Sequence, residues 1–193
     1  MKESLGGTAM NPSLEESIID LLKHHQIGIC TVESCTGGLL AHTLTQVPGS
    51  SQVFWGAMIT YDHSAKQQLG VQPETLLQYG SVSEATAREL AEAGLQRMKT
   101  SLEQATHSAL PSCKDLICIS TTGIAGPTGG SVEKPVGLCF IGLARLGRPT
   151  QVLRVLADSR QSRTDLKQEF APRALKILLQ DLQNSSHGWG DSL

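Results

Sequence analysis

The chain of 193 residues carries a formal net charge of −2 and is 39% hydrophobic, which is enough for one substantial core. No basic face dominates and only 4% of the residues are aromatic, so we expect no nucleic-acid partner. No apolar run approaches the length of a membrane span, so we expect no membrane partner. The five cysteines lack CxxC spacing, which predicts free thiols in a reduced, cytoplasmic protein.

The first half of the chain alternates helical and extended patterns. Residues 1–11 are predicted to be a flexible leader. Ser13 and Glu16 have the spacing of a capping box and predict a helix that runs through His25. "IGICTV" is a short apolar strand, "LLAHTLTQ" resumes helical spacing, and "VFWGAMITY" is a second strand.

Short helices are predicted over "SAKQQLG" and "PETLLQY", each followed or ended by glycine. Ser83 is positioned to cap a longer helix. Residues 101–114 lack clear periodicity and contain Pro111, which favours a surface insertion.

Three further strands are predicted over "LICISTT", "GLCFIGLARL" and "TQVLRVLA", with an antiparallel hairpin at Gly147-Arg148-Pro149. A last helix runs through "LKILLQDLQ", kinked or started by Pro172, and residues 185–193 are predicted to be a flexible tail. The alternation of strands and helices predicts a single α/β domain over residues 12–184, with a mostly parallel sheet.

Three polar clusters follow predicted strands: "ESCTGG", "TYDHSAK" and "TTGIAGPTGGSVEKPVG". Ligands of open parallel sheets collect at the carboxyl ends of the strands, so these clusters are candidates for one site. Their glycines permit close approach to bare backbone, although a glycine-rich loop is more often only a tight connection. The third cluster lacks the Lys-Ser/Thr of a phosphate-binding P-loop.

Ser34 has two readings, as a buried hydroxyl bonded to the next turn or as a nucleophile with a base within hydrogen-bond reach. Lys66 is the candidate base, against the commoner reading of a solvated helix residue. With a pKa near ~10.4, only about one lysine in 2,500 is neutral at pH 7. Lys66 must therefore be buried at the site, and an exposed Lys66 would exclude the role.

Other residues near these clusters leave alternatives open. Tyr61 ends a predicted strand, and its phenol is a candidate to relay a proton or orient Lys66. His42 and His63 are alternative bases, each among polar residues. Cys35 is intrinsically the better nucleophile, but adjacent residues at a strand end face opposite ways, so only one of the pair faces a cleft. No pattern of metal ligands is present in the sequence.

Taken together, the clusters resemble the C-terminal domain family of the competence-damage-inducible protein CinA, which includes stand-alone nicotinamide-nucleotide amidases. The blocks that carry the resemblance are "ESCTGGLLA", "VPGSS", "YDHSAK", "LGV", "GSVSE", "TGIAGPTGG" and "EKPVG", in family order. They cover the chain from about Leu14 to Leu182 and are long and specific.

The resemblance implies a three-layer α/β/α sandwich with a five-stranded mixed, mostly parallel sheet. It also implies hydrolysis of the carboxamide of nicotinamide mononucleotide to nicotinate mononucleotide and ammonia, without a metal or organic cofactor. Ser34 matches the family serine, Lys66 the lysine and Tyr61 the tyrosine. The candidate oxyanion and substrate-binding residues are Thr36, Gly37, Gly38, Thr122, Gly126, Gly129, Gly130, Lys134 and Arg163.

One departure from the family concerns a Gly-Asp-Arg turn before the last helix, where this chain has Ser162 in place of the aspartate and retains Arg163. Because of that change, a second hypothesis stays open: the protein is a catalytically silent module that binds a nucleotide or a partner protein. A hydrolase of another small amide is a third reading. We also expect at least a homodimer, since Phe54 and Trp55 lie beside a loop and relatives of the family associate.

Overall fold

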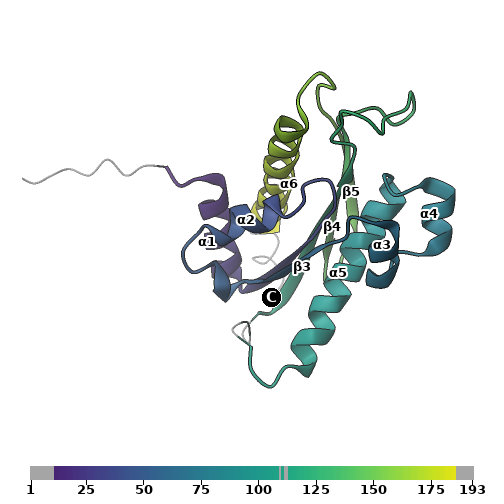
Figure 1. Cartoon of the computed structure of the whole chain (residues 1–193). Coiled ribbons are helices and arrows are strands. Elements are labelled where there is room, and N and C mark those ends of the chain that lie inside the picture. The colour runs from purple at the N-terminus through teal and green to yellow at the C-terminus, as the bar shows by residue number, and fades with distance from the viewer. Residues whose placement is uncertain (1–10, 109, 111–112, 186–193) are drawn as a thin grey trace, which may run out of the picture.

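Five strands form one mixed sheet, and helices cover both of its faces (Figure 1). The computed structural model describes residues 11–108, 110 and 113–185. The predicted leader (1–11) and the predicted tail (185–193) lie outside the described residues, except for residue 11 and residue 185. With one sheet between two layers of helices, the described residues form the predicted three-layer α/β/α sandwich.

The strands are β1 (Ile27–Glu33), β2 (Phe54–Ile59), β3 (Asp115–Gly123), β4 (Leu138–Arg145) and β5 (Gln151–Leu156). The helices are α1 (Leu14–His25), α2 (Leu39–Thr45), α3 (His63–Leu69), α4 (Pro73–Tyr79), α5 (Glu84–Gln104) and α6 (Arg163–Ser185), with one turn of 3₁₀ helix at Ser50–Gln52.

The order of strands in the sheet is β2-β1-β3-β4-β5. β1 is parallel to both β2 and β3, whereas β4 is antiparallel to β3 and β5, which confirms the predicted hairpin. Because β2, β1 and β3 run in one direction, their carboxyl ends meet at the same edge of the sheet. Glu33 marks that edge, paired with Ile59 on one side and Thr121 on the other.

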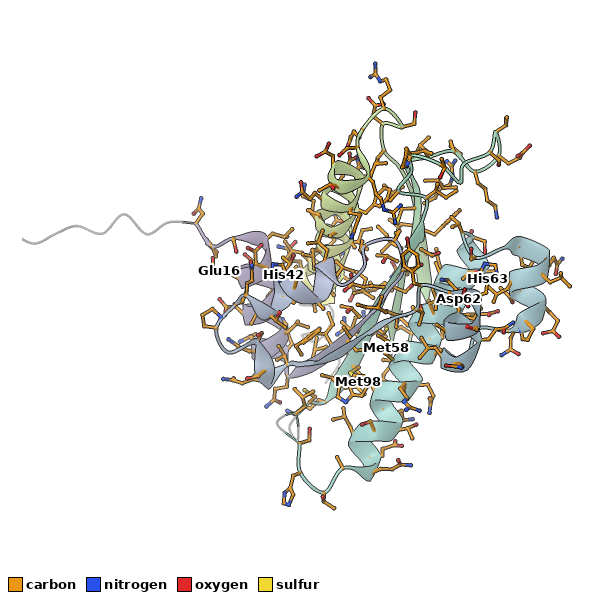
Figure 2. The ribbon with its side chains drawn as sticks, viewed as in Figure 1. Glu16, His42, Met58, Asp62, His63 and Met98 are labelled. Atoms are coloured by element: carbon orange, nitrogen blue, oxygen red, sulfur yellow. The ribbon has the colours of Figure 1, made fainter. Side chains whose placement is uncertain are left out.

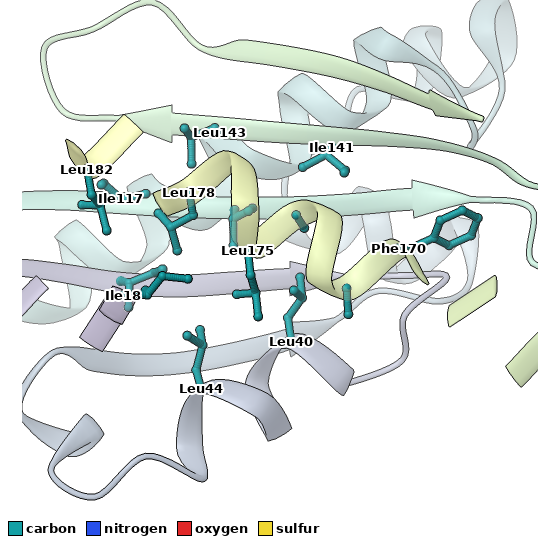
Figure 3. Packing of buried hydrophobic residues seen from close by; sticks show 14 of the residues in the cluster. Ile18, Leu40, Leu44, Ile117, Ile141, Leu143, Phe170, Leu175, Leu178 and Leu182 are labelled. Carbon is teal, nitrogen blue, oxygen red and sulfur yellow. The ribbon is translucent and has the colours of Figure 1, made fainter. Parts of the chain in front are cut away.

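Helices α1, α2 and α6 cover one face of the sheet and enclose the larger core (Figure 3). Leu175 and Leu178 of α6 are buried against this face, together with Leu40 of α2. The predicted capping box at the start of α1 is confirmed, since the Ser13 and Glu16 side chains each accept from the other's backbone N–H.

Helix α5 covers the opposite face, with α3 and α4 beside it (Figure 1). It lies close to the strands at Gly94, where a Cβ would come within 2.6 Å of Cys118 Sγ. Ser83 caps α5 as predicted, accepting from Thr86 N. The predicted surface insertion at 101–114 is partly wrong, because α5 continues to Gln104 with Leu102 packed on the core.

Pro172 lies inside α6 and does not start it, which corrects one of the two sequence readings. The helix begins after Ser162, whose hydroxyl accepts from Asp165 N and whose carbonyl accepts from Leu166 N. Ser162 is therefore the N-cap of α6, a position at which serine and aspartate are about equally good.

Phe54 and Trp55 are both half-buried and pack on the protein's own cores, on opposite faces of the sheet. Core packing thus accounts for the two aromatics, and the homodimer stays a prediction. Within the described part of the chain, no helix has the length and apolar character needed to cross a membrane.

The cap at Ser162 generates a stability prediction. Ser162→Ala should lower the free energy of unfolding by about 1 kcal/mol, because the N–H of Asp165 loses its acceptor. Ser162→Asn should stay within about 0.5 kcal/mol of the wild type, since its amide oxygen accepts from the same N–H and its NH₂ can still donate to the Asp165 carboxylate, as the serine hydroxyl does. Urea denaturation at pH 7 measures both. Equal losses in the two variants would show that Ser162 is not a cap.

Candidate active site

A cleft of about 220 Å³ opens at the edge where β1, β2 and β3 end. It is lined by residues that follow each of these strands, by the start of α6 and by the segment before α5: Ser34, Cys35, Tyr61, Lys66, Ser81, Val82, Thr122, Gly123, Ile124, Ala125, Gly126, Thr128, Gly129 and Arg163. The parallel strands therefore bring the three polar clusters of the sequence to one place.

Ser34 and Lys66 meet inside this cleft. The Lys66 Nζ lies 3.1 Å from Ser34 Oγ and also donates to the main-chain oxygens of Thr60, at 2.6 Å, and Tyr61, at 3.1 Å. Asp62 sets up this geometry by capping α3, so that Lys66 lies one helical turn after Asp62 and its N–H donates to the Asp62 carbonyl. A neutral amine at this point can donate to both carbonyls and still accept the serine proton.

Burial of the Lys66 side chain favours the neutral form of its amine. The Lys66 side chain is among the most enclosed in the protein, and the residue is 1% exposed. Desolvation lowers the pKa of Lys66 below its usual 10.5, against smaller opposing attractions from Cys35 and Asp62. The condition that the sequence set for a lysine base, burial beside the serine, is met.

Tyr61 lies at the rim of the cleft with 61% of its surface exposed. Its hydroxyl accepts a hydrogen bond from Arg163 Nη2, and Arg163 Nη1 donates to the carbonyl of Gly126 at 2.8 Å. The phenol of Tyr61 therefore binds Arg163 at the rim. The contact between Tyr61 and Lys66 is made by the main-chain oxygen of Tyr61. Arg163 joins the start of α6 to two sides of the cleft.

Cys35 lines the cleft beside Ser34, so both neighbours border it, but the Cys35 side chain is buried. Its thiol lies in the core under α6, with Cys35 Sγ 3.7 Å from Cys139 Sγ. The Cys35 contact and burial together raise the pKa of the Cys139 thiol well above its usual range. All five cysteines are free thiols, and this pair packs as buried apolar side chains.

The three oxyanion candidates of the turn are not equally placed. The N–H of Gly38 donates to the Glu33 carboxylate at 2.8 Å and is therefore engaged. Thr36 and Gly37 line a neighbouring hollow of about 300 Å³ together with His42 and Lys167 of the flanking helices. The N–H next to the serine belongs to Cys35, which is one of the residues that line the cleft, and it donates to no acceptor among the described residues.

The candidate residues in and around the glycine-rich loop after β3 also differ in whether they line the cleft. Thr122 lines the cleft and donates its hydroxyl to the carbonyl of Ser81, and Gly126 and Gly129 also line it. Gly130 packs against Val136 outside the lining. The Lys134 ammonium donates to the carbonyl of Tyr79, and Lys134 is not among the residues that line the cleft.

The alternative bases lie apart from Ser34. His42 and His63 are exposed, on α2 and α3 respectively, and Figure 2 shows them on different sides of the molecule. Neither residue lines the cleft. Over residues 11–108, 110 and 113–185, no group of three His, Cys, Asp or Glu side chains is arranged to hold a metal ion.

Glu33 is the residue that the sequence analysis missed. It is fully buried at the end of β1, and its carboxylate accepts hydrogen bonds from the N–H groups of Gly38, Leu40 and Ala41. The signal was an acidic residue in a buried strand followed by Gly-Gly and a helix. Capping rules look one to three residues ahead, and Glu33 acts five to eight residues ahead.

With this geometry in place, comparison with known proteins identifies the family. The family model of the CinA C-terminal domain matches residues 11–182. The chain belongs to the CinA C-terminal domain family. A CinA-like protein of Chloroherpeton thalassium is 44% identical over 148 residues, which is 75% of this chain and 32% of that protein. A CinA-like protein of Chlorobium phaeovibrioides is 39% identical over 183 residues, 91% of this chain and 38% of that protein.

Solved structures agree with the CinA fold. The competence/damage inducible protein CihA of Agrobacterium tumefaciens has 32% sequence identity and a TM-score of 0.75, over 91% of this chain and 99% of that one. A CinA superfamily protein of Klebsiella pneumoniae has 25% identity and a TM-score of 0.74, over 89% and 96%. The chain spans about a third of the length of the curated relatives it matches.

The buried lysine of this CinA domain generates a pH prediction. The folded-state pKa of Lys66 lies below 10.5, so between the two values the unfolded chain holds the extra proton and stability rises with pH. The free energy of unfolding of the wild type, minus that of Lys66→Met, should therefore increase towards pH 10.5 and level off above it. The slope is at most about 1.4 kcal/mol per pH unit.

Denaturant unfolding between pH 7 and 11 measures this difference, in which the other titrating groups cancel. Lys176→Met, which removes an exposed lysine, is the matched control for the loss of a lysine side chain. A difference for Lys66→Met that rises no more steeply than that for Lys176→Met would mean that Lys66 keeps an ordinary pKa in the folded protein.

Proposed function

We propose that this protein is an amidohydrolase that uses Ser34 as nucleophile and Lys66 as base, acting on the carboxamide of nicotinamide mononucleotide. The observation that carries the chemistry is the 3.1 Å contact between Ser34 Oγ and the buried Lys66 Nζ. The choice of substrate rests on the family resemblance of the "ESCTGG", "YDHSAK" and "TGIAGPTGG" blocks. The products are nicotinate mononucleotide and ammonia.

In the acylation half, neutral Lys66 takes the hydroxyl proton as Ser34 Oγ bonds to the carboxamide carbon. The oxyanion is stabilised by backbone N–H groups, for which the free N–H of Cys35 is the best-placed candidate, and one such donor is worth about 3 kcal/mol. Lys66 then gives its proton to the departing nitrogen. The C–N bond breaks, ammonia leaves and the acyl group stays on Ser34.

In the deacylation half, a water molecule attacks the ester carbon while Lys66 takes one of its protons. The bond from carbon to Ser34 Oγ breaks, and the serine recovers its proton from Lys66. The water oxygen becomes the second oxygen of the product's carboxyl group, which loses its remaining proton to solvent and leaves as the carboxylate. Lys66 thus returns to the neutral state, with both carbonyl contacts unchanged through the cycle.

The size of the cleft indicates how a mononucleotide would lie. A volume of about 220 Å³ is below the usual range for a complete drug-sized ligand, so we place the pyridine carboxamide inside and the ribose phosphate at the rim. Arg163 lies at that rim and uses two of its five N–H donors on Tyr61 and Gly126. The remaining donors suit a phosphate.

The alternative of a silent binding module rested on the loss of the family aspartate. Ser162 supplies the same cap to α6, and Arg163 stands directly after it at the cleft. The departure therefore no longer favours a silent module. The enzyme reading is the one that the Ser34–Lys66 pair supports.

Substitutions at the site test the assignment of roles. Ser34→Ala should lower kcat by at least ~10³, because the covalent nucleophile is lost, and Lys66→Ala should be comparably damaging because base and nucleophile act as a unit. Cys35→Ser is the matched control and should keep most activity, and iodoacetamide should not inactivate the wild type. Activity retained in Ser34→Ala but lost in Cys35→Ser would reverse the assignment.

The substrate is tested by ammonia release from purified protein. We expect turnover of nicotinamide mononucleotide, and a sharply higher KM for nicotinamide riboside, which lacks the phosphate that Arg163 would meet. Equal KM values would argue against a phosphate subsite. No ammonia from the mononucleotide, with turnover of another small amide, would replace the substrate and keep the mechanism.

A further inference from the structure

We infer that Glu33 is a positioning residue that fixes Ser34 against Lys66 through its buried carboxylate. The kinetic part of this inference rests on the proposed function, whereas the structural part does not. Glu33 directly precedes the serine and is completely enclosed. A buried carboxylate is costly unless its oxygens are fully hydrogen-bonded, so the contacts that compensate it show what it holds.

The carboxylate gathers the start of α2. Oε2 accepts from Gly38 N at 2.8 Å and Leu40 N at 3.2 Å, and Oε1 accepts from Ala41 N at 2.9 Å. The hydroxyl of Thr31 adds a fourth donor to Oε1 at 3.3 Å. Gly38, the N-cap of α2, has no side chain to cap the helix, so Glu33 satisfies these first N–H groups from a distance.

The main chain of Glu33 is fixed on the opposite side. Its carbonyl accepts from Thr60 N at 2.9 Å, and Thr60 is the residue whose own carbonyl holds Lys66 Nζ at 2.6 Å. The next peptide is fixed too, since Ser34 N donates to Thr121 O at 3.1 Å. Glu33 therefore connects the strand that positions the base with the turn that carries the nucleophile.

The turn from Ser34 to Gly38 is consequently closed at both ends by one residue. Its backbone begins at Glu33, and the Glu33 side chain binds the N–H groups at its far end. Gly37 and Gly38 have φ values of +63° and +97°, which let the chain double back in so few residues. If the carboxylate is removed, the turn keeps its start and loses the restraint on its end.

Glu33→Gln is the sharpest test because it preserves size and removes one acceptor. The amide NH₂ must face at least one of the backbone N–H groups, so the turn loosens while the core contacts of α2 through Leu40 and Leu44 remain. A displacement of about 1 Å costs on the order of 10²-fold in rate. We expect kcat to fall by about that factor with KM changed less than about threefold.

The matched control is Asp115→Asn. Asp115 also accepts a backbone N–H, from Leu116, and binds Arg145, but it lies at the other end of the sheet opposite Ile27. That is six residues, about 20 Å, from Glu33. Asp115→Asn should lower the denaturation midpoint and leave kcat within about twofold. Loss of kcat to the same degree in both variants would reduce Glu33 to a structural role and overturn the inference.

A second readout separates this inference from the proposed function. A fluorophosphonate reagent phosphonylates activated serines with loss of fluoride, and mass spectrometry reports the rate at Ser34. We expect a rate in Glu33→Gln at least about tenfold below that of the wild type and Asp115→Asn, whether or not the wild type releases ammonia. Equal rates in all three proteins, or no modification of wild-type Ser34, would overturn the inference.

Thr31→Val guards against a Glu33→Gln protein that does not fold. It deletes the weakest contact to the carboxylate and keeps the three backbone contacts. The expected result is a smaller fall in kcat and in Ser34 modification, about threefold, at unchanged KM. Suppose that Glu33→Gln does not fold and that folded Thr31→Val keeps the wild-type kcat and the wild-type rate of Ser34 modification. Glu33 would then contribute to folding alone, and the inference that it positions Ser34 would be contradicted.

Discussion

The site depends on one constraint, the burial of the Lys66 amine against Ser34 Oγ and two main-chain carbonyls. An ammonium at this position satisfies all three of its protons but carries a charge out of water, whereas a neutral amine satisfies both carbonyls and keeps a lone pair for the serine. The two states are thus balanced by desolvation against hydrogen bonding. That balance lowers the pKa of Lys66 below its usual value, which is the property that the proposed role as a base requires.

The rest of the architecture can be understood as support for that contact. The parallel strands β2, β1 and β3 bring the serine, the lysine and the glycine-rich loop to one edge. α3 begins at Asp62 and directs Lys66 inward, while Glu33 restrains the turn that carries Ser34. At the rim, Arg163 joins α6 to the cleft. In the proposed mechanism, the buried groups position the reacting atoms and the exposed groups meet the rest of the substrate.

Sequence patterns predicted which segments meet, because apolar periodicity fixes the strands and parallel strands share an edge. They did not predict which atoms meet. Tyr61 was expected to act through its phenol, but the chain leaves β2 with the ring at the rim and the carbonyl on Lys66. Glu33 was missed because its partners are backbone groups, which no side-chain pattern marks.

Two boundary errors have a similar origin. Residues after 101 lack a helical pattern, yet α5 continues to Gln104 because Leu102 packs on the core. Pro172 removes one helical hydrogen bond, but Phe170 and Ala174 on either side of it are buried, and this packing keeps α6 continuous. In both places tertiary contacts outweigh a local preference.

The most direct test of the central claim is the titration of Lys66 itself. Lysines labelled with ¹³C at Cε can be followed by NMR from pH 5 to 12 in the wild type, with Lys66→Met identifying the resonance. The account predicts that one lysine, absent in Lys66→Met, titrates clearly below the others and below 10.5. If every lysine resonance of the wild type titrates near 10.5, Lys66 is an ordinary cation and the base mechanism is contradicted.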